Sequence, residues 1–500
     1  MVHYEFGRRL CRFALLLAAI CLVPGLTSAA DHYVCAAATG TADGSSWTNA
    51  YTDLPASFVR GDTYWVAAGS YGSHTFSTTA SGTSVITIKA ATDSSHGSNS
   101  TGWTSSGTGT CHQGQAKFTP ASGSTAAPWN ITTSYWTFDG SYRGTWNDPT
   151  SYGFYVNNNN NGVPYNAVQA ISVSGGPSNL TFKYLVVKGS DGGTGQDQCI
   201  WFQANGNGNQ NDYVGYTLFD TPGVQALRLS SVQNFISEYN WMRNNGSAGG
   251  HSEMIAINEG GSPGNGKGPA NSNISIRYNY IENSQGAGNI STPCGCSSPG
   301  FSGYFDIYGN VFFANLAEAN SKTSAKIGAW DSVIFLNGSA IGGNMHVYNN
   351  TIVGLPSNNS ADMVNWGNGA SLTGGGTMAI ENNLWYSNTH VSEFTGAGIT
   401  WDYQSYFSQN NVTDGSAHIQ CPGGSSNCAG GNPFVNVVIN TQGRDDFHLT
   451  FDTATWTPLP PPYNVDMDGV VRTSSRGAFQ FTGASSTAPA PPTGLTATIH

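Results

Sequence analysis

Charged residues are scarce in this chain. Asp, Glu, Lys and Arg make up only 9% of its 500 residues, and the formal net charge is −11. No stretch sustains the three- and four-residue apolar spacing of an amphipathic helix. Beyond residue 30, no segment is apolar over the length that a membrane helix requires. These absences argue against a helical protein and against membrane insertion, and the acidic balance disfavours nucleic acid as a partner.

Glycine, in contrast, is abundant at 64 residues. Together with frequent Asn, Ser and Thr, it is typical of short strands joined by many turns. Five asparagines also recur in one frame, each between two β-prone stretches, at intervals of 39, 31, 40 and 33 residues: Asn240, Asn279, Asn310, Asn350 and Asn383. Such intervals indicate a coil whose turns carry loops of different length.

Equivalent residues in successive turns of such a coil lie about 4.8 Å apart. Side-chain amides at that spacing can hydrogen-bond along a column, so the five asparagines predict an asparagine ladder. The alternative is that each asparagine is a turn former at a strand end.

A second register covers the central region. Four segments superimpose without gaps, and two more fit with the same parity: QAISVSG from Gln169, QCIWFQA from Gln198, QALRLSS from Gln225, EMIAINE from Glu253, SVIFLNG from Ser332 and DMVNWGN from Asp362. Their period-two alternation is typical of strands with one buried face. It places these pairs inward: Ile171/Val173, Ile200/Phe202, Leu227/Leu229, Ile255/Ile257, Ile334/Leu336 and Val364/Trp366. It places these residues outward: Ser172/Ser174, Trp201/Gln203, Arg228/Ser230, Ala256/Asn258, Phe335/Asn337 and Asn365.

Every repeat runs in the same direction, so the strands must stack in parallel. At this point the chain resembles the right-handed parallel β-helix proteins of the pectate lyase-like superfamily, over roughly residues 35–481. The run DGSSWTNAYTDLPASFVRGDTYWVAAGSYGS resembles the opening of many secreted members, and DFHLT with DMDGVVRTSSRGAFQF resembles their closing rungs. The predicted fold is all-β, a right-handed single-stranded parallel β-helix (solenoid) with an asparagine ladder.

The two ends of the chain differ from this pattern. In residues 1–30, Arg8, Arg9 and Arg12 precede an apolar run and a small-residue cleavage site, which predicts a secretory signal peptide. We therefore expect a secreted, extracellular or periplasmic protein. The β-helix would span 31–481, with N-terminal rungs at 31–128, central rungs at 129–420 and closing rungs at 421–481. Residues 482–500 are rich in Pro, Ala, Ser and Thr and are predicted to be a disordered tail.

Seven cysteines follow the predicted signal peptide: Cys35, Cys111, Cys199, Cys294, Cys296, Cys421 and Cys428. Export permits disulfides. A Cys35–Cys111 bond would tie the N-terminal section together and a Cys421–Cys428 bond would close a turn, although sequence alone does not determine pairing. Cys199 begins an apolar strand and is predicted to be a buried thiol.

The candidate site is a groove along the outward positions of the aligned strand, because the longest insertions fall beside it: before Met254, after Ile257 and from Asn289. The catalytic candidates there are Glu253, Glu259, His251, Arg228 and Asp197. Two carboxylates and an imidazole within nine residues could supply an acid, a base and an orienting group. Alternatively, Glu253 continues a polar column with Gln169, Gln198 and Gln225, and His251 is a solvent-facing residue of a glycine-rich turn.

The resemblance to polysaccharide lyases of this fold implies a Lys or Arg base with Ca²⁺ neutralising a uronate carboxylate. Arg228, with Asp197 and Glu253 nearby, would imitate that arrangement; the alternative is an exposed arginine paired with a carboxylate. The sequence Asp466-Met467-Asp468-Gly469 is either a calcium loop or a tight turn.

Outward polar and aromatic side chains would bind the substrate. The candidates are Trp201, Gln203, Asn258, Trp241, Tyr304 and Trp330, whose rings could stack on sugars; rung-stacking is the alternative for each aromatic. Separately, Glu238 and Arg277 precede Tyr-Asn in successive repeats and predict a cross-rung ion pair.

The function predicted first is a secreted carbohydrate-active protein that binds and cleaves an extended polysaccharide, as a polysaccharide lyase or a glycoside hydrolase. The alternatives are a non-catalytic glycan-binding or adhesion protein and a structural solenoid. We expect a monomer, with polysaccharide as partner and Ca²⁺ as the candidate cofactor. The paired-aspartate set of galacturonases and the Trp-Ile-Asp-His signature of pectate lyases do not occur, so no named reaction is predicted.

Overall fold

The structure is a computed structural model. It describes residues 29–105, 107–121, 124, 126–158, 169–189, 198–203, 208–220, 222–245, 253–258, 269–282, 284, 288–292, 301–314, 332–337, 340–355, 363–367, 371–388, 391–392, 396–407, 412–413, 432–437, 446–453 and 458–483. The predicted signal peptide (1–30) and tail (482–500) lie almost entirely outside these residues. The described strands belong to one compact unit, Asp31–His500.

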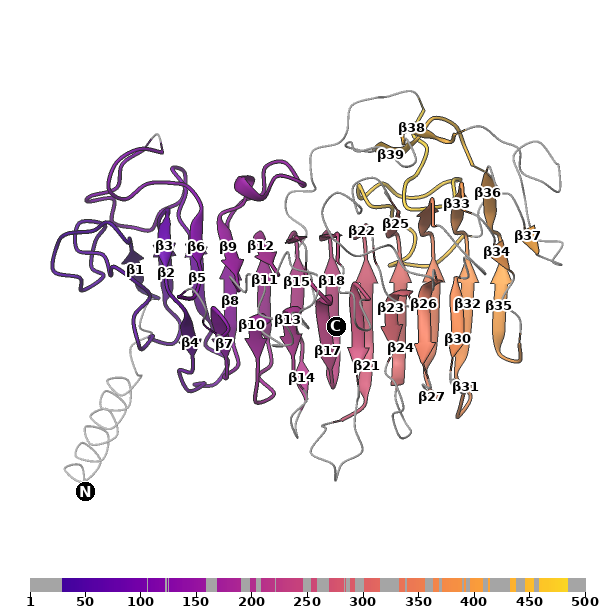
Figure 1. Ribbon diagram of the computed structural model, residues 1–500, viewed down its shortest axis with the longest axis horizontal. Coiled ribbons are helices and arrows are strands. Elements are labelled where there is room, and N and C mark those ends of the chain that lie inside the picture. Colours follow the sequence, from indigo (N-terminus) through magenta and orange to yellow (C-terminus); the bar gives the residue numbers. More distant parts are fainter. Residues whose placement is uncertain are drawn as a thin grey trace, which may run out of the picture. The chain divides into compact units, whose positions relative to one another are not determined.

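Three parallel sheets make up most of this unit (Figure 1). Sheet A contains β1 (Asp31–Val34), β2 (Thr63–Val66), β5 (Ile86–Ala90), β8 (Trp136–Asp139), β11 (Leu180–Lys183), β14 (Asn209–Gln210), β15 (Tyr213–Gly215), β18 (Val232–Glu238), β21 (Asn271–Arg277), β24 (Phe301–Tyr308), β27 (Ala340–Ile341), β28 (Asn344–Tyr348), β31 (Ser371–Leu372), β32 (Thr377–Glu381) and β35 (Ile399–Asp402). Sheet B contains β3 (Gly69–Tyr71), β6 (Ala116–Phe118), β9 (Phe154–Asn157), β12 (Leu185–Lys188), β16 (Leu218–Asp220), β19 (Trp241–Arg243), β22 (Tyr280–Glu282), β25 (Val311–Phe313), β29 (Thr351–Val353), β33 (Leu384–Tyr386) and β36 (Ser405–Phe407). Sheet C contains β4 (His74–Phe76), β7 (Trp129–Ile131), β10 (Gln169–Val173), β13 (Gln198–Phe202), β17 (Gln225–Ser230), β20 (Ile255–Asn258), β23 (Gly288–Thr292), β26 (Ser332–Asn337) and β30 (Val364–Gly367).

The chain visits the sheets in turn. In the central rungs it passes through a strand of sheet C, one of sheet A and one of sheet B, and then returns to sheet C one rung further on. Each returning strand pairs in parallel with its predecessor; for example, Ile171 of β10 faces Ile200 of β13. The predicted parallel β-helix is therefore confirmed.

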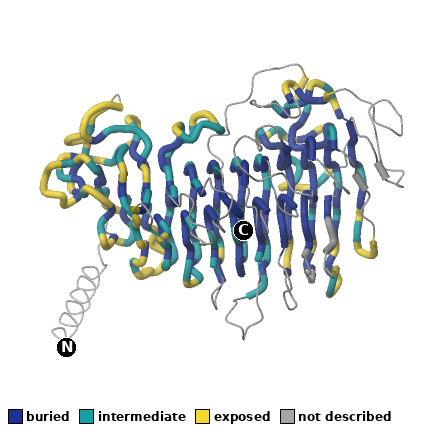
Figure 2. The backbone as a smooth tube through the Cα atoms, in the orientation of Figure 1, coloured by how far each residue is buried: buried dark blue, intermediate teal, exposed yellow. Residues whose placement is uncertain are grey.

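The inward positions form the core. Along sheet C the fully buried residues in register are Ile171, Ile200, Leu227, Ile255, Ile290 and Ile334. Burying each of these side chains contributes about 1.5–3 kcal/mol, so the stack is a major source of stability. The buried strands of the central rungs are dark blue in Figure 2.

The predicted register of sheet C is correct, with one rung missing. Strand β23 lies between β20 and β26, pairing Ile290 with both Ile255 and Ile334. The segment from Asn289 was expected to be a long insertion, and that expectation is wrong for its first residues. Asn289-Ile290-Ser291-Thr292 has a single large apolar side chain, too weak an alternation to identify a strand.

A sharp bend separates sheet A from sheet B. Tyr184, Tyr216, Tyr239 and Tyr278 stand at this bend with φ of 60°, 54°, 54° and 55°. Residues other than glycine adopt this left-handed conformation rarely. Stacking of the four tyrosine rings helps to offset the cost of this backbone conformation. Successive ring centroids along the column are 5.1, 5.1 and 5.3 Å apart.

Asparagines follow the bend and form a buried column. Each Nδ2 of Asn240, Asn279, Asn310 and Asn350 donates to the Oδ1 of the next asparagine, ending at Asn383, over 3.0–3.1 Å. The same Oδ1 atoms accept from the backbone N–H groups of the preceding rung, for example Asn240 N over 3.1 Å. All five side chains are fully buried, so these bonds remove what would be costly unpaired amides.

A second column of asparagines lies at the entry to sheet A, where the sequence did not reveal it. Asn211 donates to Asn179, Asn234 to Asn211 and Asn273 to Asn234, over 3.3, 2.9 and 2.9 Å. All four have positive φ. Each precedes a bend tyrosine by five residues, which is a signal that could have identified the column.

The described part of 421–481 does not form closing rungs. Strands β38 (Phe434–Asn436) and β39 (Asp446–Leu449) pair with each other in antiparallel fashion. Phe447 packs against Tyr280 and Phe313 of sheet B, with centroids 5.8 and 5.3 Å apart. The chain therefore turns back over the β-helix here, and the predicted closing rungs are wrong for this part. A short parallel pair, β34 (Val391–Ser392) with β37 (Val412–Thr413), and a 3-10 turn, Pro149–Ser151, complete the described elements.

The N-terminal section is tied by the Cys35–Cys111 disulfide, one of the two pairings considered from sequence. Cys199 is buried, as expected, and its Sγ donates to the Val187 carbonyl over 3.4 Å. The other four cysteines lie outside the described residues: Cys294, Cys296, Cys421 and Cys428.

Candidate functional site

The outer face of sheet C carries a row of side chains matched by strand register. From one rung to the next, the outward residues are Thr75, Asn130, Ser172, Trp201, Arg228, Ala256, Ser291 and Phe335. Hydroxyl and amide groups occupy the first three positions, and an aromatic ring and a guanidinium follow. We call these residues the sheet C row.

Trp201 and Arg228 form the centre of this row. The guanidinium carbon of Arg228 lies 4.4 Å from the ring centroid of Trp201, and both side chains are half-buried. Such a cation–π contact contributes about 0.5–1 kcal/mol at an exposed site and holds both side chains in place. The Nε1 atom of Trp201 is buried and has no hydrogen-bond partner among the described residues.

Neighbouring rungs of sheet C are also linked by side-chain hydrogen bonds. Gln203 Nε2 donates to Ser172 Oγ over 2.9 Å, and Gln169 Nε2 donates to Gln198 Oε1 over 3.1 Å. The polar column predicted for the two glutamines therefore exists between them. Because these bonds fix the side chains, the face presents a preorganised set of donors and acceptors.

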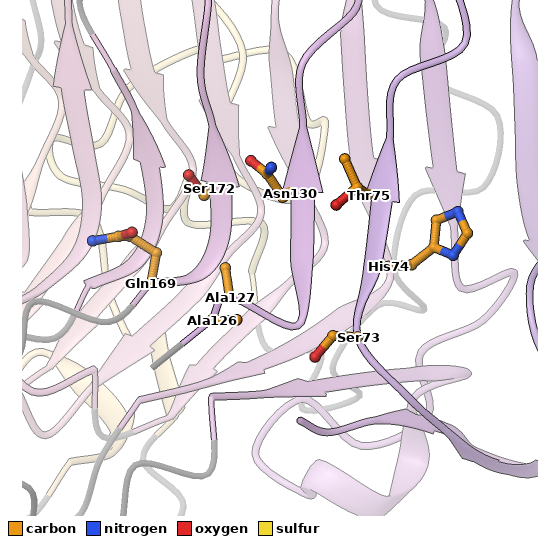
Figure 3. A pocket seen from close by; sticks show the side chains of 8 residues that line it. All are labelled: Ser73, His74, Thr75, Ala126, Ala127, Asn130, Gln169 and Ser172. Atoms are coloured by element: carbon orange, nitrogen blue, oxygen red, sulfur yellow. The ribbon is translucent and has the colours of Figure 1, made fainter. Parts of the chain in front are cut away.

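A cavity of ≈ 350 Å³ opens at the N-terminal end of the row (Figure 3). Its lining residues are Ser73, His74, Thr75, Ala126, Ala127, Asn130, Gln169 and Ser172. Burial lowers the pKa of His74 to about 4, so its imidazole is neutral at physiological pH. His74, Thr75 and Asn130 were missed in the sequence, although HTFST and WNITT share one alternation that could have aligned these two rungs.

The catalytic candidates divide into those that the structure places and those beyond the described residues. Arg228 faces outward beside Trp201 and Ala256, as predicted. Glu253 is fully buried, so its carboxylate is not exposed on the sheet face. Asp197, His251 and Glu259 lie outside the described residues.

The substrate-binding candidates do not share one face. Trp201, Gln203 and Asn258 belong to sheet C, or directly follow one of its strands. Trp241 lies in β19 of sheet B and Tyr304 in β24 of sheet A, so the expectation that they line the same groove as Trp201 is wrong. The bend before Asn240 turns the following strand away from the preceding sheet. Trp330 lies outside the described residues.

Trp241 and Tyr304 also have different surroundings. The Nε1 atom of Trp241 donates to Glu282 Oε2 over 2.9 Å, and its ring stacks on Tyr280 with centroids 5.5 Å apart. Tyr304 is 39% exposed. Trp241 thus serves rung stacking, the alternative considered for each aromatic.

The predicted cross-rung ion pair is confirmed, and it is structural. Arg277 Nε lies 2.6 Å from Glu238 Oε2, and the two residues are in register. Tyr213 donates to the other carboxylate oxygen over 3.0 Å, and Arg277 Nη1 donates to the Tyr308 hydroxyl over 2.9 Å. The pair is largely buried, which leaves no room for a substrate between its members.

The Asp466–Gly469 segment does not fit a calcium ion. Asp466 is buried and its carboxylate accepts from the backbone N–H groups of Asp468, Val470 and Gln480. The Asp468 carboxylate accepts from His448 Nε2 over 2.8 Å. Both carboxylates are thus engaged in a tight turn. No group of three or more His, Cys, Asp or Glu side chains is arranged to hold a metal ion in the described part of the chain.

Comparisons with known proteins find only distant structural likenesses. No family model and no curated protein sequence match the chain. Among solved structures, the pectate lyase Pel9A is 14% identical with a TM-score of 0.47, over 92% of this chain and 98% of that one. An alginate lyase from Paenibacillus sp. str. FPU-7 is 11% identical (TM-score 0.33; 73% and 93% covered), and a family 28 exopolygalacturonase from Yersinia enterocolitica is 10% identical (0.33; 73% and 72%).

Likenesses with TM-scores below 0.5 assign neither a fold nor a function to this chain. The assignment of this chain as a parallel β-helix rests on the strand register of sheets A, B and C.

Among the residues that the structure describes, there is no helix with the length and apolar character of a membrane span.

Proposed function

We propose that this is a secreted carbohydrate-active protein that binds an extended polysaccharide across the outer face of sheet C. The observation that carries the proposal is the Trp201–Arg228 stack within a row of hydroxyl and amide side chains. An aromatic ring offers an apolar surface to the C–H face of a sugar. The flanking Ser172, Asn130 and Gln203 supply hydrogen-bonding groups for sugar hydroxyls.

The arrangement of the row supports an extended ligand. Its members repeat once per rung at the strand spacing of about 4.8 Å, so three or four rungs match the length of a few sugar units. The row contains no acidic side chain from Thr75 to Phe335. A glycan therefore meets no carboxylate of the row, which would repel it only if the glycan itself were acidic. Secretion is supported by the character of residues 1–30 and by the Cys35–Cys111 bond.

The proposal also includes cleavage of the bound glycan, by a lyase or a hydrolase reaction. His251 and Glu259 are the candidates for the acid and the base. One observation favours the non-catalytic alternative: Glu253 is fully buried. Release of reducing ends from a glycan panel would establish cleavage, and absorbance of an unsaturated product would identify a lyase.

The binding proposal is tested by Trp201→Ala, measured by affinity electrophoresis and calorimetry on a panel of plant and algal polysaccharides. We expect at least about tenfold weaker binding, since stacking residues at the centre of a site dominate its energy. Trp241→Ala is the matched control, because Trp241 is also half-buried and stacked across rungs but belongs to sheet B. Equal losses in the two variants, or full binding by Trp201→Ala, would contradict the proposal.

A further inference from the structure

One carboxyl group lies inside the core of the β-helix. Asp212 comes directly before β15, and the register of β15 with β11 and β18 places it level with Leu180 and Phe235. Both of those neighbours are fully buried, and Asp212 itself is only 1% exposed. A charged side chain at such a position is costly unless it is paired. Asp212 therefore requires either a cation or a proton.

The hydrogen bonds of this carboxyl group are too few to stabilise a charge. Asp212 Oδ1 accepts from the Leu180 N–H over 2.9 Å. The Oδ2 atom is buried and has no hydrogen-bond partner among the described residues. A buried carboxylate is kept ionised when two or three backbone N–H groups donate to it. Here burial outweighs the single N–H group and raises the pKa of Asp212 well above its ordinary value.

The titratable groups of the surrounding strands all face away from Asp212. Lys183 of β11 and Glu238 of β18 are in register with Gly215, three residues after Asp212. An odd number of residues along a strand reverses the face, so both charges lie on the outer side of sheet A while Asp212 points inward. The others are Tyr213 of β15, which donates to Glu238 on that outer side, Arg228 of β17, which faces outward beside Trp201, and Cys199 of β13, whose Sγ donates to the Val187 carbonyl on sheet B.

A second buried oxygen without a partner lies in the same rung. Asn209 is fully buried, and its Nδ2 donates to the carbonyl groups of Gln203 and Ser230, both over 3.3 Å. Its Oδ1 has no hydrogen-bond partner among the described residues. A protonated carboxyl group is a donor as well as an acceptor. A proton on Asp212 Oδ2 would therefore serve Asn209 Oδ1, directly or through one buried water.

We propose that Asp212 is protonated in the folded protein at neutral pH, and that this buried proton is a pH-sensitive switch for the rung that joins β13 to β17. With the proton in place, the carboxyl group is neutral and the rung is closed. Loss of the proton at alkaline pH leaves an unpaired charge in the core, and the rung loosens. Asn209 transmits the change to sheet C, because it holds the carbonyl groups two residues after Trp201 and two residues after Arg228.

Urea unfolding of the full-length wild type and of Asp212→Asn, from pH 5 to 8, tests the proposal. Asparagine keeps an acceptor for the Leu180 N–H and is neutral at every pH, as the protonated acid is. The unfolded wild type loses the Asp212 proton near pH 3.9, so above that pH the wild type takes up a proton on folding and becomes less stable as pH rises. The unfolding equilibrium constant of the wild type, divided by that of the variant, should rise about tenfold per pH unit.

Two further variants make this comparison secure. Asp212→Leu should give the same slope with pH even where Asp212→Asn does not fold, because the hydrogen bond that it loses costs the same at every pH. Asp43→Asn is the control: hydrogen bonds from Ser45 and Thr41 lower the pKa of the exposed Asp43, so its ratio should not change over this range. A ratio that stays constant in both Asp212 variants, or that rises equally in Asp43→Asn, would overturn the proposal.

The effect on glycan binding rests on the proposed function and is measured separately. Across the pH at which the stability ratio levels off, the affinity of the wild type for a bound polysaccharide should fall severalfold, while that of Asp212→Asn stays constant. An equal fall in both proteins would overturn the link to sheet C. Absence of polysaccharide binding at every pH would contradict the proposed function and leave the buried proton to be decided by the stability ratio alone.

Discussion

The edge between sheets A and B and the outer face of sheet C are built by the same alternation of inward and outward residues, but their outward side chains differ in kind. At the A–B edge, residues 458–481 fold back over the strands. The Tyr463 hydroxyl donates to Asp306 Oδ2 over 2.9 Å, and the Tyr463 ring packs against Tyr308 and Tyr348 with centroids 5.0 and 5.1 Å apart. Further along, Ala478 N donates to Thr351 Oγ1 over 2.8 Å. We call residues 458–481 the covering segment.

Charges that the covering segment buries must be paired, and the two faces differ in how many charges they carry. On sheet A, Glu238 pairs with Arg277, and Asp306 Oδ1 lies 2.8 Å from His346 Nδ1. In the sheet C row, Arg228 is the only ionisable side chain from Thr75 to Phe335. The difference indicates that the ion pairs of sheet A hold the structure together.

The largest loss of stability is expected when one partner of a buried ion pair on sheet A is removed. Arg277→Ala leaves the Glu238 carboxylate buried without its cation, which should destabilise the protein by about 3–5 kcal/mol. Arg228→Ala removes a cation–π contact between two half-buried side chains and should cost about 1 kcal/mol or less. Urea unfolding midpoints of the two variants measure both values.

A paired substitution provides the control. Replacing both partners, Glu238→Gln with Arg277→Met, removes the uncompensated charge and should recover most of the lost stability. If Arg228→Ala were as destabilising as Arg277→Ala, the two faces would not differ in the way described.

The stability of the protein should also depend on pH through His448, which precedes the covering segment in the chain. His448 Nδ1 lies 2.5 Å from Asp446 Oδ1 and its Nε2 lies 2.8 Å from Asp468 Oδ2. Burial by itself would lower the pKa of His448, but the hydrogen bonds and charges of the two aspartates outweigh it and raise the pKa to about 10. Because the folded pKa exceeds the unfolded value of about 6.5, this stabilisation is complete below pH 6.5 and is lost as pH rises towards 10.

His448→Gln should therefore lower the free energy of unfolding by about 2 kcal/mol at pH 6, after allowing for partial exposure. The difference between the variant and the wild type should vanish near pH 10. Urea unfolding of both proteins at pH 6, 8 and 10 measures this difference. A difference that stays constant over this range would show that His448 is not charged in the folded protein.

Much of the β-helix could be predicted from the sequence, because period-two alternation and recurring asparagines are local signals. The pairing of Gln169 with Gln198 and of Trp201 with Arg228 follows from aligning strands by parity alone. Parity does not say which of three sheets a strand joins. Trp241 directly follows the Tyr239–Asn240 bend, and the positive φ of Tyr239 that places the next strand on sheet B has no certain sequence signal.

The position of the covering segment could not be predicted from the sequence for another reason. Contacts such as Tyr463 with Asp306 join residues 157 apart in the chain, and no periodicity links them.

The smallest losses of stability are expected when one hydroxyl group is removed on each face. Tyr463→Phe removes the hydrogen bond to Asp306 and should destabilise the covering segment by about 1–2 kcal/mol, because the acceptor is a carboxylate. Ser172→Ala on sheet C removes a hydroxyl that accepts from Gln203 and should change stability by no more than about 0.5 kcal/mol, since Gln203 is only half-buried. Hydrogen exchange of residues 458–481 should accelerate in Tyr463→Phe and stay unchanged in Ser172→Ala. Acceleration in both variants would mean that the covering segment responds to general loss of stability rather than to its own contact with sheet A.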